Sequence, residues 1–228
     1  MANYVLIPGA GSDSWYWHLV VPELQARGHD VVTPDLPIDD DSAGLAEYLE
    51  VVLDAVGDRR DLIVVAQSMG GFTAPLLCDR VPVDLMILVA AMVPAPGESP
   101  GEWWANTGQA EAKRANDERE GRPTDGDFDP FVTFLHDVPP EVAAESAHHV
   151  FEQSGTPFQK PWPLPAWPDV PTRFLLCRDD RLFPADFQRR VVKERLGITP
   201  DEMDGGHLPA LSRPLELVER LEAFRLAL

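Results

Sequence analysis

The chain contains 228 residues, 44% of them hydrophobic, and its formal net charge at pH 7 is −19. A chain of this length and composition can bury one hydrophobic core, with or without a small appendage. The charge argues against nucleic acid and anionic membranes as partners, because both polyanions would repel the protein, and we expect a neutral or apolar small-molecule ligand.

Short apolar runs alternate with helical patterns along most of the chain. The first run, residues 4–7, stops at Pro8-Gly9-Ala10-Gly11 and predicts a buried strand that feeds a glycine-rich turn. The patterns predict further strands at residues 30–34, 61–66, 85–90, 172–177 and 198–203, and helices at residues 19–25, 44–56, 69–80 and 184–194 and from residue 214 onward. Such βα units predict an α/β fold with a mainly parallel sheet of about six strands flanked by helices.

The alternation fails between residues 94 and 170. This segment is rich in proline, glycine and charge, and helical patterns occur only at residues 103–120 and 140–151. A gap this long between sheet strands predicts a mostly helical cap inserted into a single domain that spans residues 1–228. The cap contains Trp103, Trp104, Phe131, Phe134 and Phe151, which either face a substrate or form a core of their own. Trp104 and Phe134 are the first choices for contact with substrate.

Ser68 stands at the end of a predicted strand, within Val64-Val-Ala-Gln-Ser-Met-Gly-Gly-Phe72. A serine at this place could simply cap the following helix. In a parallel α/β sheet, however, ligands bind at the carboxyl ends of the strands. The pattern Ala66-x-Ser68-x-Gly70 differs by one methyl group from G-x-S-x-G, the sharp turn that exposes a nucleophilic serine. We therefore expect Ser68 to be a nucleophile, provided that a base activates it.

His207 is the candidate general base. It follows two glycines after the last predicted strand and precedes the closing helix, so it too lies at a strand's carboxyl end. The remaining histidines are expected to be solvated or capping groups, apart from His136 in the cap; they are His18, His29, His148 and His149.

Two adjacent carboxylates follow the strand at residues 172–177, and one of them can orient the base. Asp180 is the choice, because Asp179 is more simply interpreted as a loop or helix-end charge. Glu98, shortly after the fourth strand, is the alternative if neither aspartate acts. The order serine, aspartate, histidine along the chain is typical of one family of hydrolase folds.

Backbone amides can stabilise the oxyanion of acyl transfer. Met69 offers an N–H at a helix N-terminus, and Ala10 offers another in the turn after the first strand. That turn lacks the G-x-G-x-x-G spacing of a dinucleotide site, and no His/Cys/Asp/Glu cluster has metal-ligand spacing, so neither a cofactor nor a metal is expected.

Cysteine usage and the start of the chain favour a reducing compartment. Cys78 and Cys177 lie in apolar segments, and the N-terminal stretch lacks the features of a signal peptide. No apolar run approaches the roughly 20 residues that span a bilayer. We expect a cytoplasmic protein without a membrane anchor, and the sequence leaves the choice between a monomer and a homodimer open.

Several motifs make the chain similar to α/β-hydrolases, and especially to the branch that holds plant methyl-ester esterases and hydroxynitrile lyases with their bacterial relatives. These motifs are Pro8-Gly-Ala-Gly11 with Trp15 and Trp17, Gly28-His-Asp-Val-Val-Thr-Pro-Asp-Leu36, Gln67-Ser-Met-Gly-Gly71, Cys177-x-x-Asp180-x-x-x-Pro184 and Gly206-His-Leu-Pro-Ala-Leu-Ser-Arg-Pro214. The chain departs from the family pattern in carrying Pro8-Gly9 in place of His-Gly, Ala66-Gln67-Ser68 in place of Gly-His-Ser, and Cys177 in place of glycine.

The resemblance implies an α/β-hydrolase fold and a cofactor-independent serine hydrolase. Leu208 stands where the similar hydroxynitrile lyases carry lysine, which argues against cyanohydrin cleavage. A carboxylesterase acting on a small or medium, largely apolar ester is the leading hypothesis. Thioester, lactone and carbon–carbon bond hydrolysis on the same triad are alternatives, as is a ligand-binding or receptor-like protein of this fold with slow turnover.

Overall fold

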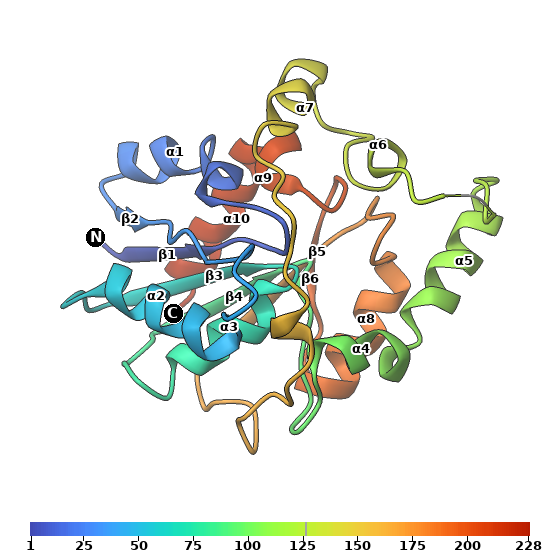
Figure 1. The fold of residues 1–228 in the computed structure, drawn as a ribbon. Helices are drawn as coiled ribbons and strands as arrows, with labels where there is room; N and C mark the ends of the chain where they lie inside the picture. Colours follow the sequence, from blue (N-terminus) through green and yellow to red (C-terminus); the bar gives the residue numbers. More distant parts are fainter. Residues whose placement is uncertain (126) are drawn as a thin grey trace.

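A computed structural model describes residues 1–125 and 127–228, and in these ranges six strands form one sheet in the order β2-β1-β3-β4-β5-β6 (Figure 1). Every neighbouring pair in that sheet is parallel. The strands are β1 (Asn3–Ile7), β2 (Asp30–Val32), β3 (Leu62–Gln67), β4 (Leu85–Val89), β5 (Thr172–Cys177) and β6 (Asp201–Met203). The prediction of a mainly parallel sheet of about six strands is confirmed.

Side chains of successive strand residues point to opposite faces of the sheet, and each face has its own core. On β3, Val64 and Ala66 join the core on one face, whereas Ile63 and Val65 join the other. The first core is completed by α2 (Leu45–Val56), α3 (Gly70–Leu77) and α8 (Ala185–Leu196), and the second by α1 (Val21–Ala26), α9 (Pro209–Ser212) and α10 (Pro214–Leu226). Burial on both faces explains why the strands are almost continuously apolar in the sequence.

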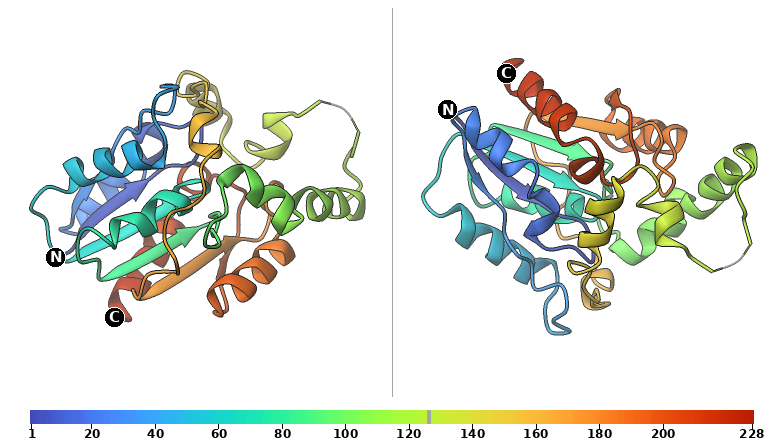
Figure 2. Two further views of the ribbon diagram at one scale, coloured as in Figure 1. Left: turned by 60° about the horizontal axis from the view of Figure 1, so that its bottom comes forward. Right: turned by 90° about the horizontal axis from the view of Figure 1, so that it is seen from above.

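Residues 94–170, which we call the cap, connect β4 to β5. They contain α4 (Pro100–Thr107), α5 (Gln109–Arg119), α6 (Pro130–Thr133), α7 (Pro140–Ser146) and the 3-10 turn η2 (Thr156–Phe158). Figures 1 and 2 show α5, α6 and α7 gathered beyond the carboxyl ends of the strands. No helix of the described chain is long and apolar enough to cross a membrane.

Local sequence sets the helix boundaries in the cap. Ser99 and Glu102 form a capping box that starts α4, because each side chain accepts a hydrogen bond from the other's backbone N–H. The continuous helix predicted at residues 103–120 is wrong: Gly108 adopts a left-handed backbone with φ of 65°, ends α4 and lets α5 begin in a new direction. The second predicted helix also ends early, at Ser146, and a turn at residues 147–149 leads to an isolated antiparallel bridge between Val150 and Ser12.

Candidate active site

Ser68 occupies a strained turn between β3 and α3. Its φ of 49° lies in the left-handed region, which costs a residue with a side chain about 1–3 kcal/mol. Space around the turn is short as well: a β-carbon on Gly70 would lie 3.0 Å from the carbonyl oxygen of Pro8, and one on Gly71 would overlap the carbonyl oxygen of Met92. The small residues after the serine therefore permit the close approach that holds its hydroxyl above the strand ends.

A chain of hydrogen bonds links Ser68 to His207 and Asp180. The Nε2 atom of His207 lies 3.0 Å from Oγ of Ser68, and its Nδ1 atom lies 2.8 Å from Oδ2 of Asp180. His207 is 3% exposed and Asp180 is 2% exposed, so water competes little for these bonds. A neutral imidazole with its proton on Nδ1 donates to the carboxylate and accepts from the serine hydroxyl.

The two adjacent carboxylates after β5 have different partners. Oδ1 of Asp180 accepts hydrogen bonds from the backbone N–H groups of Leu182 and Phe183, both at 2.8 Å, which leaves Oδ2 for His207. Asp179 instead accepts from the backbone N–H of Gly205 at 3.1 Å. Only Asp180 therefore faces the imidazole.

Glu98, the alternative acid, belongs to a different cluster. Its Oε1 atom accepts from Arg195 at 2.8 Å and from Asn106 at 2.9 Å. Burial raises the pKa of the Glu98 carboxyl, but hydrogen bonds from these two side chains outweigh burial and hold the pKa below its ordinary value. Glu98 joins the cap to α8 through Arg195, whereas the ring of His207 bonds to Asp180 and Ser68.

The backbone N–H groups near Ser68 differ in whether they already donate a hydrogen bond. The N–H of Ser68 donates to Val89 at 3.3 Å, and that of Gly11 donates to Oε1 of Gln153 at 3.2 Å. Among the described residues, the N–H groups of Ala10 and Met69 have no hydrogen-bond acceptor. Both residues line the cavity that also holds Ser68, so the residues predicted to donate to the oxyanion and the serine share one cavity.

A cavity of about 600 Å³ opens above Ser68 and His207, with mostly apolar walls. Trp104 and Phe134, the cap residues predicted to contact substrate, both line it, and the Phe134 ring lies 5.5 Å from the His207 ring. The other three cap aromatics named from the sequence are not in this wall. Trp103 is buried against Phe183 and Phe187, whereas Phe131 and Phe151 are exposed.

Sequence reasoning missed part of the cavity wall. His149, expected to be a solvated or capping residue, lines the cavity and stacks on Trp15 with ring centroids 4.5 Å apart. The expectation for His29 was also wrong, because it is buried and bonds to Glu222. These partners lie more than a hundred residues away along the chain, so no local pattern signals them.

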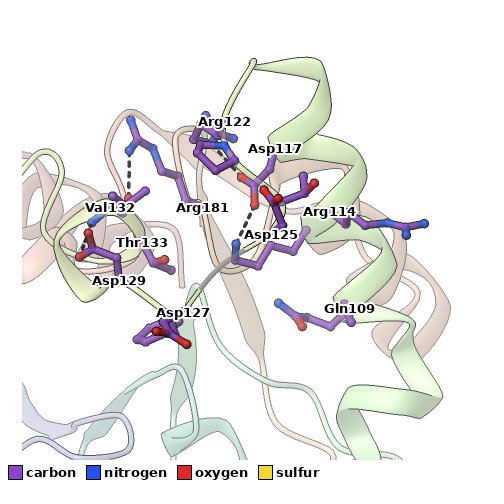
Figure 3. Close-up of a pocket in the computed structure, with 15 residues that line it drawn as sticks. Gln109, Arg114, Asp117, Arg122, Asp125, Asp127, Asp129, Val132, Thr133 and Arg181 are labelled. Carbon is purple, nitrogen blue, oxygen red and sulfur yellow. Dashed lines mark hydrogen bonds and ion pairs between the residues drawn. The ribbon is translucent and has the colours of Figure 1, made fainter.

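A second cavity, of about 590 Å³, lies between α5 and α6 in the cap (Figure 3). Its wall is charged: Asp117 accepts from Lys113 at 2.6 Å and from Arg122 at 2.7 Å, and Arg181 donates to the carbonyl of Val132. Ser68, Asp180 and His207 are not among the described residues that line it. In the part of the chain that the structure describes, no group of His, Cys, Asp or Glu is arranged to hold a metal ion.

Comparison with known proteins adds independent evidence. A family model described as "Alpha/beta hydrolase family" matches residues 4–221. The chain is 28% identical over 247 residues to a pyrethroid hydrolase of Sphingobium wenxiniae, covering 98% of this chain and 88% of that protein. It is 27% identical to methylesterase 7 of Arabidopsis thaliana, with 94% of this chain and 93% of that protein covered. The crystal structure of polyneuridine aldehyde esterase superposes with a TM-score of 0.79, 18% identity and 99% of each chain covered.

Proposed function

Because the chain belongs to the alpha/beta hydrolase family, we propose that it is a serine carboxylesterase that cleaves a small to medium, largely apolar ester. The observation that carries this proposal is the hydrogen-bond chain from Ser68 through His207 to Asp180 beneath an apolar cavity. Serine is a weak nucleophile at neutral pH, and a base that is hydrogen-bonded to its hydroxyl activates it by accepting the proton.

The proposed reaction proceeds through an acyl-enzyme. Ser68 Oγ attacks the ester carbonyl carbon while Nε2 of His207 takes the hydroxyl proton, and the protonated imidazole then gives that proton to the leaving alcohol. In the second half, His207 takes a proton from the water that attacks the acyl carbon, and it returns that proton to Ser68 Oγ as the bond to Oγ breaks and the carboxylic acid leaves. Asp180 holds the imidazole in the correct tautomer and stabilises its charged form.

The free N–H groups of Ala10 and Met69 form the proposed oxyanion hole. In both tetrahedral intermediates, negative charge develops on the former carbonyl oxygen, and fixed amide donors stabilise it without reorganising. The loss of one such donor costs roughly 2.7–4 kcal/mol in enzymes of this type.

The cavity supports an apolar substrate. Its volume of about 600 Å³ is within the range of small-molecule sites, and its wall is dominated by carbon atoms from Trp104, Phe134 and their neighbours. The names of the similar proteins, a pyrethroid hydrolase and a methylesterase, agree with ester chemistry. The net charge of −19 further disfavours polyanionic substrates.

A panel of p-nitrophenyl esters with increasing acyl length, together with matched thioesters and lactones, tests the proposal on purified protein. We expect turnover of the esters, with a preference for apolar acyl groups. Faster turnover of a thioester or lactone would move the assignment to that bond class. Binding of apolar ligands without turnover of any of them would identify a ligand-binding protein instead.

A further inference from the structure

Gln67, the residue immediately before Ser68, has a buried amide that reaches across the active site. It is the last residue of β3 and is 2% exposed. Its Nε2 atom donates a hydrogen bond of 2.9 Å to the backbone carbonyl oxygen of His207. The side chain therefore connects the strand that carries the nucleophile to the loop that carries the base.

The same amide also packs against the turn that holds Ala10. A β-carbon on Gly9 would overlap Oε1 of Gln67 and would lie 2.9 Å from the β-carbon of Ser68. Glycine at position 9 thus allows the turn to rest directly on Gln67. One side chain consequently contacts the nucleophile's strand, the loop of the base and the turn of the oxyanion donor.

The backbone of the His207 loop needs such support, because the loop is rich in glycine. Gly205 has a φ of 113°, a conformation that only glycine adopts readily. Carboxylates from outside this loop bind the backbone N–H groups of the two residues before His207. Asp179 accepts from the N–H of Gly205, and Asp137 accepts from the N–H of Gly206 at 2.7 Å. Gln67 supplies the matching donor for the carbonyl of His207 itself.

We propose that Gln67 is a positioning residue for catalysis, whose amide fixes the His207 loop so that Nε2 meets the Ser68 hydroxyl. This inference rests on the proposed esterase function. Catalytic geometry is sensitive, because a shift of about 1 Å between reacting groups can cost roughly a hundredfold in rate. Gln67 also lines the cavity, but its amide N–H is bonded to the backbone of His207, so we expect loss of this donor to lower kcat more than it changes KM.

Gln67→Met removes the donor while keeping a side chain of similar length, and Gln67→His restores an N–H at a similar distance from the α-carbon. Thr172→Val is the control, because the half-buried Thr172 also donates to a backbone carbonyl, that of Val170 at 3.0 Å, but lies at the amino end of β5, opposite the strand end that leads to Asp180. We measure kcat and KM for an ester turned over by the wild type, the rate of phosphonate labelling of Ser68, and the melting temperature.

For Gln67→Met we expect kcat and the labelling rate to fall by about 10- to 100-fold, with KM changing less than about threefold. Gln67→His should return kcat to within about fivefold of the wild type, and Thr172→Val should lower the melting temperature while keeping kcat within about threefold of the wild type. If Gln67→Met does not fold, Gln67→Asn carries the test, because its amide is one methylene too short to reach.

Three results would overturn the positioning role: kcat unchanged in Gln67→Met, no recovery in Gln67→His, or an equal loss of kcat in Thr172→Val. A wild type that neither hydrolyses esters nor becomes labelled at Ser68 would instead overturn the proposed function, and the role of Gln67 with it. The two failures are therefore distinguishable from the wild-type assay alone.

Discussion

Oδ2 of Asp13 lies 3.1 Å from Nδ1 of His149, so a carboxylate from the turn after β1 holds a ring from the returning segment of the cap. Neighbouring contacts strengthen this junction. The N–H of Phe151 donates to the carbonyl of Gly11 at 3.1 Å, and the N–H of Gly11 donates to Oε1 of Gln153 at 3.2 Å. The cap is thus attached to the same turn that presents the Ala10 amide.

Gln153→Met should lower kcat by about tenfold, because it leaves the N–H of Gly11 unpaired and loosens the turn that holds the Ala10 donor. Steady-state kinetics on an apolar ester measures the effect. Gln159→Met in the same cap segment is the control, since Gln159 is exposed and is not among the described residues that line the cavity. Equal kinetics in the two variants would show that the junction does not influence the oxyanion site.

Ser68→Ala should abolish nearly all ester turnover and leave the melting temperature close to that of the wild type. The substitution removes one hydroxyl from an accessible turn and creates no buried cavity. A fluorophosphonate should label the wild type at Ser68, as peptide mass mapping would show. Substantial turnover by Ser68→Ala, or a label mapped to another residue, would contradict covalent catalysis at this serine.

Asp180→Asn should reduce kcat by several orders of magnitude, because an amide at this position favours the wrong tautomer of His207. Asp179→Asn is a closely matched control: its remaining oxygen can still accept from the N–H of Gly205, so we expect less than about a threefold change. Measuring kcat of both variants on one ester shows which carboxylate orients His207. The reverse pattern would move the orienting role to Asp179.

The sequence predicted those parts of the molecule that local patterns control. The run at residues 172–177 gave the bounds of β5 correctly, because its apolar side chains and its flanks mark a buried strand. Ser68, Asp180 and His207 were singled out from turn chemistry and their places after strands, and the structure brings them together. Their catalytic roles stay predictions until the variants above are measured.

Features that depend on distant contacts were not predictable in this way. The stacking of His149 on Trp15 requires the cap to fold back onto the turn after β1. In the sequence, Gln67 is a departure from a family motif, and its hydrogen bond to His207 is visible only in the folded structure. The short helices α6 and α9 have four residues each, too few for helical periodicity to show in the sequence.

We expect low pH to decrease the free energy of unfolding through protonation of Glu222. This residue lies in α10, on the face of the sheet that carries the second core. Glu222 accepts hydrogen bonds from Tyr4 at 2.6 Å and from Arg225 at 2.9 Å, and pairs with His29 at 3.1 Å. Burial raises the pKa of its carboxyl, but these partners outweigh burial and lower the pKa from 4.5 to about 2. The carboxylate therefore stabilises the fold fully above pH 4.5, and this contribution is lost as the pH falls towards 2.

Glu222→Gln tests this linkage. Urea unfolding at a series of pH values from 7 down to 3 should show a lower free energy of unfolding for the variant at neutral pH, and a difference from the wild type that shrinks below pH 4.5. Other carboxylates titrate in both proteins and cancel in the difference. A constant difference across the series would contradict the assignment.

Phe134→Ala should change the chain-length preference of the enzyme more than its chemical step. The Phe134 ring lines the cavity and packs on Phe128 with ring centroids 5.4 Å apart, in addition to its contact with His207, so its removal enlarges the apolar space available to substrate. We expect the optimum of a p-nitrophenyl ester series to shift to longer acyl groups.

Trp104→Ala should shift the preference too, but with a lower melting temperature, because Trp104 also packs on Trp103. Phe131→Ala is the control, since that ring is 66% exposed and does not line the cavity, and its ester profile should match the wild type. A uniform loss across the series in Phe134→Ala, with unchanged preference and a lowered melting temperature, would show that this ring supports the cap and does not contact substrate.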